Sequence, residues 1–391
     1  MSDQRPFIII GGGIGGMAAA IALGRRGFAT HVLEQASAFG EVGAGIQLGP
    51  NVFRAFEALG VRDQIVADAW FPQNLEMRDA LTGASITKIP VGAGFKQHFG
   101  EPYGVTHRAD IHKTLMDAAA AQPHSVLETN ARVESFEDNG EGVRVHLADG
   151  RTIEGRAIIG CDGLWSKTRE YVVGDGAPIV SGHIAYRAVL PRAEVPEDLW
   201  SGDVILWAGP KTHLVQYPLR RGELFNLVAV FHSDRYEEGW NAEGDIDELM
   251  HRFAGERPEV MRLLERIETW RMWVLCDREP VKNWSRGRVT LLGDAAHPML
   301  QYLAQGANMA CEDALRLAEE ITSTPNDLAD AFLRYQQARY LRTGRVQTMA
   351  RIYGEFYHAA GVKAELRNAA LGGRTAEQSW AGMDWLYGGS W

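Results

Sequence analysis

The run Phe7-Ile8-Ile9-Ile10-Gly11-Gly12-Gly13-Ile14-Gly15-Gly16 is the most informative part of the sequence. Its continuous apolar start, rich in isoleucine, is typical of a short buried strand. The glycines Gly11, Gly13 and Gly16 match the pattern G-x-G-x-x-G, and an alanine-rich run over 17–23 follows them. The first glycine of this pattern permits a sharp turn, the second lets the backbone approach a pyrophosphate, and the third lets the helix pack on the strand. The run therefore predicts a strand, a tight turn and a helix.

The residues that follow indicate a dinucleotide site at this turn. A helix N-terminus attracts phosphates because its free N–H groups and its dipole favour negative charge. A second apolar run, 30–33, ends at Glu34, about 20 residues after the glycines, where a ribose hydroxyl needs a carboxylate. We therefore expect Gly11, Gly13, Gly16 and Glu34 to bind the cofactor. The alternative is a strand-to-helix turn that binds nothing, and the strand, helix and acidic residue in place argue against it.

Composition narrows the class of protein. A chain of 391 residues is expected to form two domains. The formal net charge of -10 argues against nucleic acid and anionic membranes as partners, since both need basic surfaces. The cysteines Cys161, Cys276 and Cys311 lack metal-ligand spacing, so we expect reduced thiols and no metal site. We expect a cytoplasmic protein, because the segment from Met1 to Arg5 lacks a signal pattern and no later run reaches membrane-spanning length.

The next part of the chain adds a loop, a helix and a hairpin. The stretch 39–49 is rich in glycine and follows the predicted site, so we interpret it as backbone that approaches a ligand closely; a mobile loop is the alternative. A helix is predicted over 50–59, with Gly60 as its C-terminal cap. Alternation over 74–90, around a turn at 81–83, predicts a β-hairpin that leaves the first domain.

Arg108 stands at the start of a helix predicted from 108 to about 121. A positive charge at that end opposes the helix dipole, so another role is expected for it. Contact with a cofactor phosphate or ribityl oxygen would supply that role, and a surface salt bridge is the alternative.

The remainder of the chain predicts a second sheet and a helical end. Short alternating runs between 126 and 160 predict a β-meander, and 181–232 is rich in the β-branched and aromatic residues of longer strands. The elements expected after them are two helices, a buried strand and a mostly helical remainder, at 245–254, 258–267, 288–292 and from Gly306 onward. The final segment contains Trp380, Trp385 and Trp391.

Two further motifs resemble those of a known family. A predicted buried strand runs into Gly160-Cys161-Asp162-Gly163, and another runs into Gly293-Asp294-Ala295-Ala296-His297-Pro298. The first resembles the Asp-Gly motif and the second the Gly-Asp motif of the FAD-dependent aromatic hydroxylases. Together with the glycine pattern near the N-terminus, all three markers of that family are present in order. The resemblance covers nearly the whole chain.

The resemblance implies a tightly bound, non-covalent FAD and a transient NADH. Asp294 is expected at the ribityl hydroxyls, although this residue also fits the N-cap of a helical turn. Asp162 and Arg169 are expected where NADH passes, and no second G-x-G-x-x-G provides a separate nicotinamide domain. The family further implies a homodimer, to which the aromatic residues near the C-terminus would contribute. The helix start that is expected to stabilise negative charge at the flavin N1–C2=O edge consists of Gly306, Ala307 and Asn308.

The segment 213–218 carries the expected catalytic histidine. Alternate side chains of a strand share a face, so His213, Val215 and Tyr217 are predicted to point the same way. A strand histidine beside a tyrosine is more often a structural pair. The segment resembles that of hydroxylases acting on small hydroxylated aromatic acids, and this resemblance favours His213 as the base that removes a phenol proton. An unperturbed imidazole pKa of about 6.5 would suit that role.

Gln301 is expected beside the flavin ring, in the loop after the Gly-Asp motif. Its uncharged amide can hold substrate oxygens without competing for the proton, and loop scaffolding is the alternative. Proline is common in this loop of the family, whereas this chain has Leu300-Gln301-Tyr302, which favours a particular substrate subgroup.

The implied reaction is hydroxylation of 3-hydroxybenzoate para to its hydroxyl, to give 2,5-dihydroxybenzoate. In the family NADH reduces FAD, O2 adds to give a flavin C4a-hydroperoxide, and the electron-rich phenolate ring takes its distal oxygen. Salicylate and 6-hydroxynicotinate are the alternative substrates. An FAD-dependent dehydrogenase or reductase that inserts no oxygen is the alternative from another class.

The expected fold is an α/β, Rossmann-like FAD-binding domain interrupted by an antiparallel β-sheet substrate domain, with a helical C-terminal region. We expect the FAD-binding domain in three parts, at 1–72, 98–178 and 271–320. The substrate domain is expected at 73–97 and 179–270, and the helical region at 321–391.

Overall fold

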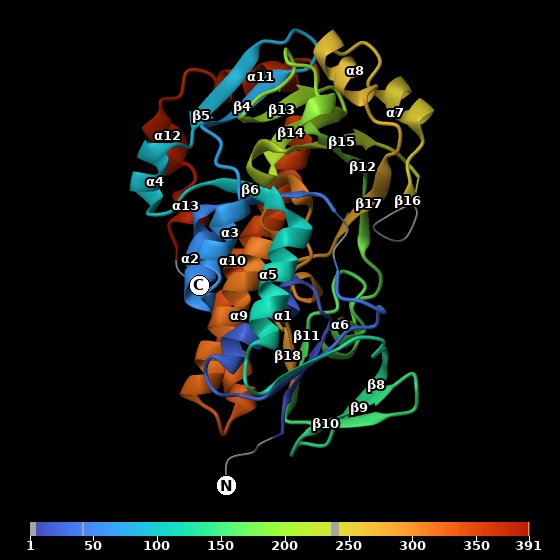
Figure 1. Cartoon of the computed structure of the whole chain (residues 1–391), viewed down its shortest axis with the longest axis vertical. Helices are drawn as coiled ribbons and strands as arrows, with labels where there is room; N and C mark the ends of the chain where they lie inside the picture. The colour runs from blue at the N-terminus through green and yellow to red at the C-terminus, as the bar shows by residue number, and fades with distance from the viewer. Residues whose placement is uncertain (1–4, 41–42, 236–241, 390) are drawn as a thin grey trace.

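The computed structural model describes residues 5–40, 43–235, 242–389 and 391, and it arranges them as two halves along one long axis (Figure 1). Residues 41–42 of the glycine-rich stretch and residues 1–4 of the N-terminal segment lie outside the described residues. Each half is built around its own β-sheet. The predicted class, α/β with a helical C-terminal region, is confirmed.

A mostly parallel sheet forms the first half. The described part of the chain gives it six strands, in the order β18 (Ser285–Arg286), β19 (Val289–Leu291), β11 (Ala157–Gly160), β1 (Phe7–Ile10), β2 (Thr30–Leu33) and β7 (Ser125–Glu128). Strand β1 lies between β2 and β11, parallel to both, and it leads into helix α1 (Ile14–Gly24). The predicted strand, turn and helix at the N-terminus are therefore confirmed.

Both faces of this sheet are buried, which explains why β1 is a continuous apolar run. Phe7 and Ile9 face a core shared with α1, whereas Ile8 and Ile10 face a smaller core on the other side. The first core is completed by α2 (Pro50–Leu59), α3 (Arg62–Asp68), α5 (Arg108–Ala120), α9 (Gly306–Ser323) and α10 (Leu328–Tyr357). The second is closed by a three-stranded antiparallel sheet of β8 (Val133–Asp138), β9 (Val143–Leu147) and β10 (Thr152–Gly155), beside α6 (Lys167–Val172).

The β-meander predicted between 126 and 160 is confirmed only for its middle part. Strands β8, β9 and β10 form it, but β7 before them and β11 after them belong to the parallel sheet. The alternating pattern gives each strand its exposed and buried side, and it does not specify which sheet the strand joins.

The second half contains a larger sheet. Among the described residues it has eight strands, in the order β16 (Ala242–Glu243), β17 (Arg271–Asp277), β12 (Ile179–Pro191), β15 (Leu224–His232), β14 (Thr212–Leu219), β13 (Val204–Gly209), β4 (Asn74–Asp79) and β5 (Ser85–Pro90). All neighbours are antiparallel except β13 and β4, which run parallel. The predicted hairpin at 74–90 is β4 and β5, and Gly83 in its turn has a φ of 78°.

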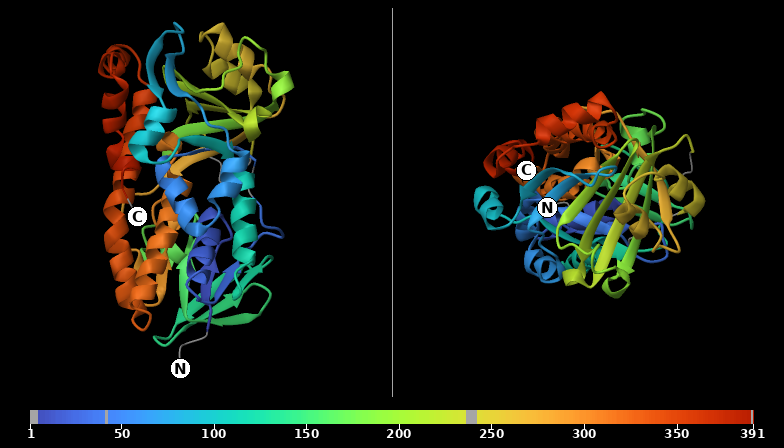
Figure 2. Two further views of the ribbon diagram at one scale, coloured as in Figure 1. Left: turned by 60° about the vertical axis from the view of Figure 1, so that its left-hand side comes forward. Right: turned by 90° about the horizontal axis from the view of Figure 1, so that it is seen from above.

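The two faces of the eight-stranded sheet have different neighbours. One face packs against α7 (Ile246–Arg252) and α8 (Pro258–Leu264), which confirms the two helices predicted there. The other face turns toward α10 and the short 3-10 turn η4 (Gln301–Leu303). Helix α10 has 30 residues, so it is about 45 Å long and reaches beside both halves (Figure 2).

The remaining elements connect the halves or cover them. They are β3 (Gly45–Leu48), which pairs with β6 (Gly104–His107), α4 (Ala93–Phe99), the 3-10 turns η1 (Arg192–Glu194), η2 (Arg220–Gly222) and η3 (Gly293–Ala295), and α11 (Val362–Leu371), α12 (Ala376–Ala381) and α13 (Asp384–Tyr387). No helix in the described part of the chain is both long and apolar enough to cross a membrane.

One expected domain boundary differs from the structure, and the C-terminal aromatic residues are partly buried. Strand β17 pairs with β12 in the eight-stranded sheet, whereas the expected boundary at 270/271 places it with the FAD-binding domain. The division of the whole chain into domains otherwise stays a prediction. The C-terminal aromatic residues pack inward: Trp380 donates to Pro90 O, and Trp391 donates to Glu319. Trp380, Trp385 and Trp391 are half-buried, and their part in a dimer interface stays a prediction.

Candidate functional site

The turn between β1 and α1 has the geometry of an anion site. Gly11 has a φ of 107°, and a Cβ there would lie 2.3 Å from Cys161 O. A Cβ on Gly16 would lie 2.0 Å from Gly11 O, so this glycine permits the helix to pack on the strand and does not line the site itself. Gly13 is the N-cap of α1 and provides no side-chain cap, which leaves the first-turn N–H groups available to a phosphate.

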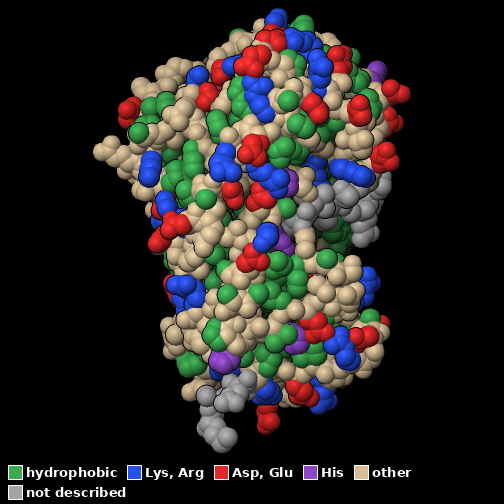
Figure 3. All heavy atoms as spheres, in the orientation of Figure 1, with side chains coloured by type: hydrophobic (Ala, Val, Ile, Leu, Met, Phe, Trp, Pro, Cys, Tyr) green, Lys and Arg blue, Asp and Glu red, His purple; other side chains and the backbone are tan. Residues whose placement is uncertain are grey.

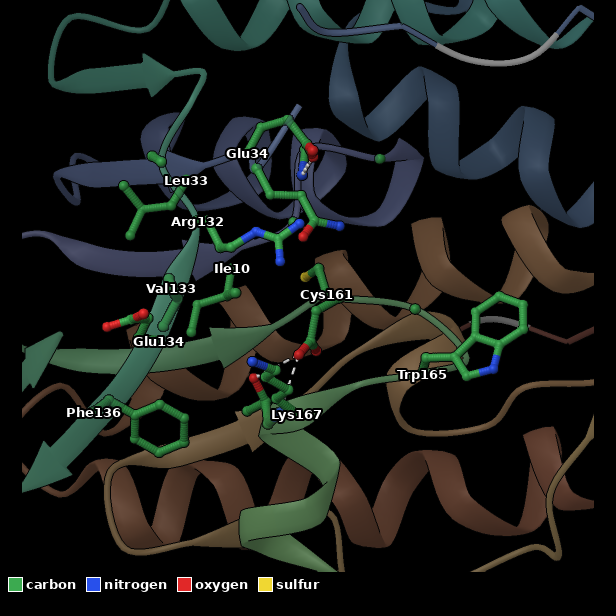
Figure 4. Close-up of a pocket in the computed structure, with 18 residues that line it drawn as sticks. Ile10, Leu33, Glu34, Arg132, Val133, Glu134, Phe136, Cys161, Trp165 and Lys167 are labelled. Atoms are coloured by element: carbon green, nitrogen blue, oxygen red, sulfur yellow. Dashed lines mark hydrogen bonds between the residues drawn. The ribbon is translucent and has the colours of Figure 1, made fainter. Parts of the chain in front are cut away.

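A cavity of about 290 Å³ opens beside this turn (Figure 4). Three parallel strands contribute to it at their carboxyl ends: Glu34 follows β2, Arg132 follows β7, and Asp162 follows β11. In the view of Figure 4, Glu34 and Lys167 lie on opposite sides of the cavity, with Arg132 between them. The structure thus brings the predicted Gly11, Gly13, Glu34 and Asp162 together at one cavity.

Glu34 is held by backbone donors at the edge of this cavity. Its carboxylate accepts hydrogen bonds from Gly12 N at 2.9 Å and Ala36 N at 2.8 Å. The side chain therefore has a fixed position at the end of β2, where a ribose hydroxyl would be bound in a Rossmann-type site.

Asp162 organises the loop before α6. One carboxylate oxygen accepts from Ser166 Oγ at 2.5 Å, and the other accepts from the N–H and the hydroxyl of Thr168, each at 3.0 Å. Burial raises the pKa of Asp162 despite these bonds. The residue lines the cavity, but its oxygens are engaged by its own loop.

The expectation that Arg169 lies on the path of NADH is wrong. Its side chain is 1% exposed and forms an ion pair with Asp175. It also donates to Ala295 O and Ala296 O of the Gly-Asp motif. Its guanidinium therefore joins the two motifs from inside, because its donors satisfy buried carbonyl groups.

Asp294 and the start of α9 lie side by side. A Cβ on Gly306 would be 3.6 Å from Asp294 Oδ1. Gln305, the N-cap of α9, provides no side-chain cap, because its side chain accepts a hydrogen bond from Asn51. The N–H groups of the first turn, at Gly306, Ala307 and Asn308, therefore form a second uncapped helix N-terminus. These residues are not part of the cavity beside Gly11.

Buried charges support this second helix start. His297 of the Gly-Asp motif contacts Asp313 of α9 at 2.5 Å, and Arg339 of α10 contacts Asp313 at 2.7 Å and Glu312 at 2.8 Å. Burial alone would raise the pKa of Asp313, but His297 and Arg339 keep it below its ordinary value. The network fixes the motif, α9 and α10 relative to one another.

Arg108 lies beside the glycine-rich stretch. It is the first residue of α5, as predicted, and its N–H donates to Ala44 O at 2.8 Å. A Cβ on Gly43 would come within 3.1 Å of the neighbouring His107 ring. The structure therefore places Arg108 next to close-packed backbone, and its contact with a cofactor stays a prediction.

The predicted alternation along β14 is confirmed. His213 packs against Tyr302, and Val215 and Tyr217 pack in the cluster next to it. Leu214 belongs to the core on the opposite face of the sheet. His213 and Tyr217 therefore point together toward the side occupied by α10 and η4.

Tyr217 lies under the start of β3. A Cβ on Gly45 would lie 2.7 Å from Tyr217 Oη, and Gly45 N donates to Asn226 at 2.8 Å. Burial raises the pKa of Tyr217 far above its ordinary value, and a hydrogen bond with Gln47 only partly opposes this. The phenol therefore stays protonated at neutral pH.

His213 has partners that the sequence did not reveal. It is 2% exposed, its Nδ1 lies 2.6 Å from His358 Nε2, and its ring centroid is 5.6 Å from that of Tyr302, the residue after Gln301. Burial, with a smaller contribution from His183, lowers the pKa of His213 to about 3. The expected pKa near 6.5 is therefore wrong for the ligand-free site.

Arg132 and His358 are the main residues that we did not predict. Arg132 follows β7, which belongs to the parallel sheet. Ligands bind at the carboxyl ends of such strands, so Arg132 could have been predicted if β7 had been assigned to this sheet. His358 caps the far end of α10 and meets His213 only through the fold, so no local pattern indicates it.

Comparison with known proteins agrees with this geometry. The family model described as "FAD binding domain" matches residues 5–349. The chain is 45% identical to a 3-hydroxybenzoate 6-hydroxylase of Polaromonas naphthalenivorans, over 99% of this chain and 98% of that protein. It is 35% identical to a 6-hydroxynicotinate 3-monooxygenase of Bordetella bronchiseptica, over 90% of this chain and 91% of that protein.

A solved structure shares the whole fold. Klebsiella pneumoniae HpxO, crystallised with FAD and uric acid, superposes with a TM-score of 0.87 at 26% identity, covering 98% of this chain and 96% of that one. The uncapped helix starts of α1 and α9, the glycine cradle at Gly11 and the fixed carboxylate of Glu34 fit such a dinucleotide. The chain therefore belongs to the FAD-dependent aromatic hydroxylase family.

Proposed function

We propose that the protein hydroxylates 3-hydroxybenzoate para to its hydroxyl, giving 2,5-dihydroxybenzoate, with NADH and O2 as co-substrates. The observation that carries this proposal is the face of β14, where His213 and Tyr217 point toward the η4 turn that contains Gln301. The similarity to a 3-hydroxybenzoate 6-hydroxylase at 45% identity supports the same substrate.

The cofactor would lie between two helix starts. Glu34 and the first turn of α1 would hold its adenosine and pyrophosphate end, and Asp294 with the first turn of α9 would hold its flavin end. When bound, FAD would take a hydride from NADH and supply an electrophilic oxygen derived from O2. We propose the same binding roles for Arg108 and Asp162, the latter through the loop that it shapes.

The side chains of β14 would make the substrate ring electron-rich. His213 accepts the phenol proton at Nε2, because its Nδ1 is bonded to His358. The phenolate that results carries more electron density at its ortho and para carbons, and in 3-hydroxybenzoate the para carbon is C6. A positioned base of this kind typically contributes about 10²- to 10⁴-fold to the rate.

Tyr217 and Gln301 would fix the orientation of the ring. Tyr217 keeps its proton, so it can donate a hydrogen bond to a substrate oxygen. Gln301 is partly exposed in η4, and its amide can donate or accept without taking the proton that His213 needs. Holding the ring within about 3–3.5 Å of the reacting oxygen is what such contacts achieve.

The other partners follow from the same proposal. We propose a homodimer in the cytoplasm, with a small hydroxylated aromatic acid, NADH and O2 as its only substrates. The thiols of Cys161, Cys276 and Cys311 are free, as reduced cysteines would be. On the face shown in Figure 3, acidic and basic side chains are interspersed, which does not favour a polyanion there.

The test is a comparison of three substrates with purified FAD-loaded protein, NADH and air. Products from 3-hydroxybenzoate, salicylate and 6-hydroxynicotinate are identified by NMR, and NADH consumption is measured alongside. The expected result is 2,5-dihydroxybenzoate from 3-hydroxybenzoate, in step with NADH. Catechol from salicylate would overturn the substrate, and NADH oxidation without a hydroxylated product would favour a flavin dehydrogenase or reductase.

A further inference from the structure

Four histidines meet where β12, β14, β15 and the end of α10 come together. His183 and His232 are direct partners across β12 and β15, and His213 lies on the next strand, β14. His358 caps α10 and lies over the sheet, with ring centroids 4.8 to 4.9 Å from those of the other three histidines. His358 shares hydrogen bonds with His213 and His232, so the protonation states of these three imidazoles are coupled.

His358 connects two of the other imidazoles. Its Nε2 lies 2.6 Å from His213 Nδ1, and its Nδ1 lies 2.9 Å from His232 Nε2. The backbone keeps this order: His358 O accepts from Lys211 N at 3.0 Å, and Lys211 O accepts from His232 N at 3.1 Å. The three rings therefore form one continuous hydrogen-bonded row.

The row leads from the interior toward the surface. His213 is 2% exposed and His358 is 5% exposed, whereas His232 is half-buried. The charged groups that act on His232 are Glu355 of α10, Lys211 of the turn before β14 and Arg252 of α7. The rings that pack against His213 and His358 from η4 and α10 are the phenols of Tyr302 and Tyr357.

The hydrogen bonds favour proton transfer over metal binding. Nitrogen atoms of His183, His232 and His358 lie within 4.8 Å of one another, which is close enough for a shared metal ion. However, both ring nitrogens of His358 are engaged by other imidazoles. Its one nitrogen lone pair already accepts a hydrogen bond and is therefore not available to a metal ion. A neutral imidazole bonded at both nitrogens can accept a proton on one side and release one on the other.

We infer that His358 and His232 carry the phenol proton from His213 to solvent; this inference rests on the proposed role of His213 as the base. The phenol O–H bond breaks as His213 Nε2 gains the proton, and His213 Nδ1 then gives its own proton to His358 Nε2. His358 Nδ1 passes a proton to His232 Nε2, and His232 Nδ1 releases one to water. One proton leaves the phenol and one reaches solvent, and the phenolate product resets the row by taking a proton back along it.

Burial makes such a path necessary. Burial and the neighbouring imidazoles lower the pKa of both His213 and His358, so neither ring keeps an added proton at neutral pH. A base that cannot store the proton must pass it on before the ring is attacked. His358 and His232 are therefore positioning residues that act through His213.

The experiment measures proton release on substrate binding. FAD-loaded enzyme is mixed rapidly with 3-hydroxybenzoate in weak buffer without NADH, and the phenolate absorbance is followed together with a pH indicator. We expect His232→Gln and His358→Gln to slow both signals about tenfold or more, since each removes one carrier. Added imidazole is expected to restore the rate in His232→Ala by occupying the space left by the ring.

The matched control is His183→Gln, in the same cluster but bonded to Tyr302 and outside the row. Its rate of proton release is expected to stay within about twofold of that of the unmodified enzyme. In all variants, FAD content and the rate of flavin reduction by NADH are also expected to stay within about twofold. Unchanged proton release in His232→Gln would overturn the inference, and so would an equal loss in His183→Gln. His232 is half-buried, so this test holds even if His358→Gln fails to fold. Failure of the proposed function is seen separately, as absence of 2,5-dihydroxybenzoate from the unmodified enzyme.

Discussion

In the proposed reaction, His213 decides whether the substrate ring becomes reactive. His213→Ala is expected to slow hydroxylation by about 10²- to 10⁴-fold, because the phenol then keeps its proton. Flavin reduction by NADH is expected to continue, since it does not need the phenolate. Mixing reduced enzyme with O2 in a single turnover, and quantifying the product, separates the two steps. The control is His124→Ala, at an exposed histidine that is distant from His213 in the sequence. An unchanged product yield in His213→Ala would remove His213 from this role.

Glu34 is the single side chain on which adenosine binding should depend most. Its carboxylate is held by Gly12 N and Ala36 N, so it is positioned before any ligand arrives. Glu34→Ala is expected to weaken FAD binding by about 10- to 100-fold, the cost of losing one charge-assisted hydrogen bond. Titration of apoprotein by flavin fluorescence measures the change, with the exposed Glu137→Gln as control. Equal affinity in Glu34→Ala and the control would contradict the assignment.

Individual residues differ in how far the sequence predicts them. The period of two along a strand placed His213 and Tyr217 on one face, because that geometry is local. The pKa of His213 was not predictable, since it depends on burial and on His183, which is distant in sequence. Asp162 and Arg169 were identified by their motif, yet Asp162 bonds within its own loop, and Arg169 bonds the carbonyls of Ala295 and Ala296 in the Gly-Asp motif.

At the scale of elements, the buried charges between α9 and α10 hold the start of α9, where we propose that the flavin end of the cofactor binds. Arg339 is 0% exposed and pairs with both Asp313 and Glu312. Arg339→Met is expected to lower the free energy of unfolding by about 3–5 kcal/mol, because it removes the buried cation that Asp313 and Glu312 share. Urea unfolding monitored by flavin fluorescence checks this. Arg334→Met on the same helix, at an ion pair whose arginine is partly exposed, should cost much less. Equal losses would mean that the buried network adds no stability.

The histidines between the second sheet and α10 couple stability to pH. Burial lowers the pKa of His213 to about 3 and that of His183 to about 4. Below about pH 6.5 the unfolded chain binds protons at these positions and the folded protein does not. Stability should therefore be complete above that pH and fall by about 1.4 kcal/mol per pH unit for each such histidine as the pH approaches 4. Urea midpoints at about pH 7.5 and about pH 5 measure the slope. His213→Asn should reduce it, and an unchanged slope would contradict the assignment.

Elements with local signals were predicted, and those defined by distant pairing were not. The glycine pattern gave β1 and α1, and Gly60 correctly ended α2 with a φ of 77°. Strands β7 and β17 were assigned to the wrong neighbours, because alternation shows a strand's two faces and not its partner. The histidine row needs three strands and a helix end, which only the complete fold brings together.

At the scale of the whole molecule, the exposed apolar side chains of the C-terminal helices are where a second copy is expected to dock. Leu341, Val362 and Leu366 are 70%, 69% and 65% exposed. Contiguous exposed apolar side chains mark association surfaces, and we expect these three to contribute to one. Light scattering is expected to give the mass of a dimer, and Leu341→Glu is expected to reduce it toward that of a monomer. Leu81→Glu, at a 49% exposed leucine on the β4–β5 hairpin, is the control. A monomeric unmodified protein would contradict the proposed dimer.

The way the chain crosses between its two sheets also limits how such a protein can evolve. The eight-stranded sheet takes β4 and β5 from one early segment and its other strands from 179–277, while α10 later packs beside both halves. Genetic exchange of one contiguous segment that replaces the whole eight-stranded sheet would therefore also take β7 and β11 from the parallel sheet and divide that sheet between two parents. New substrate preferences are more accessible through single codon changes at positions such as those of β14 and η4, which alter the proposed substrate site without touching the strand order.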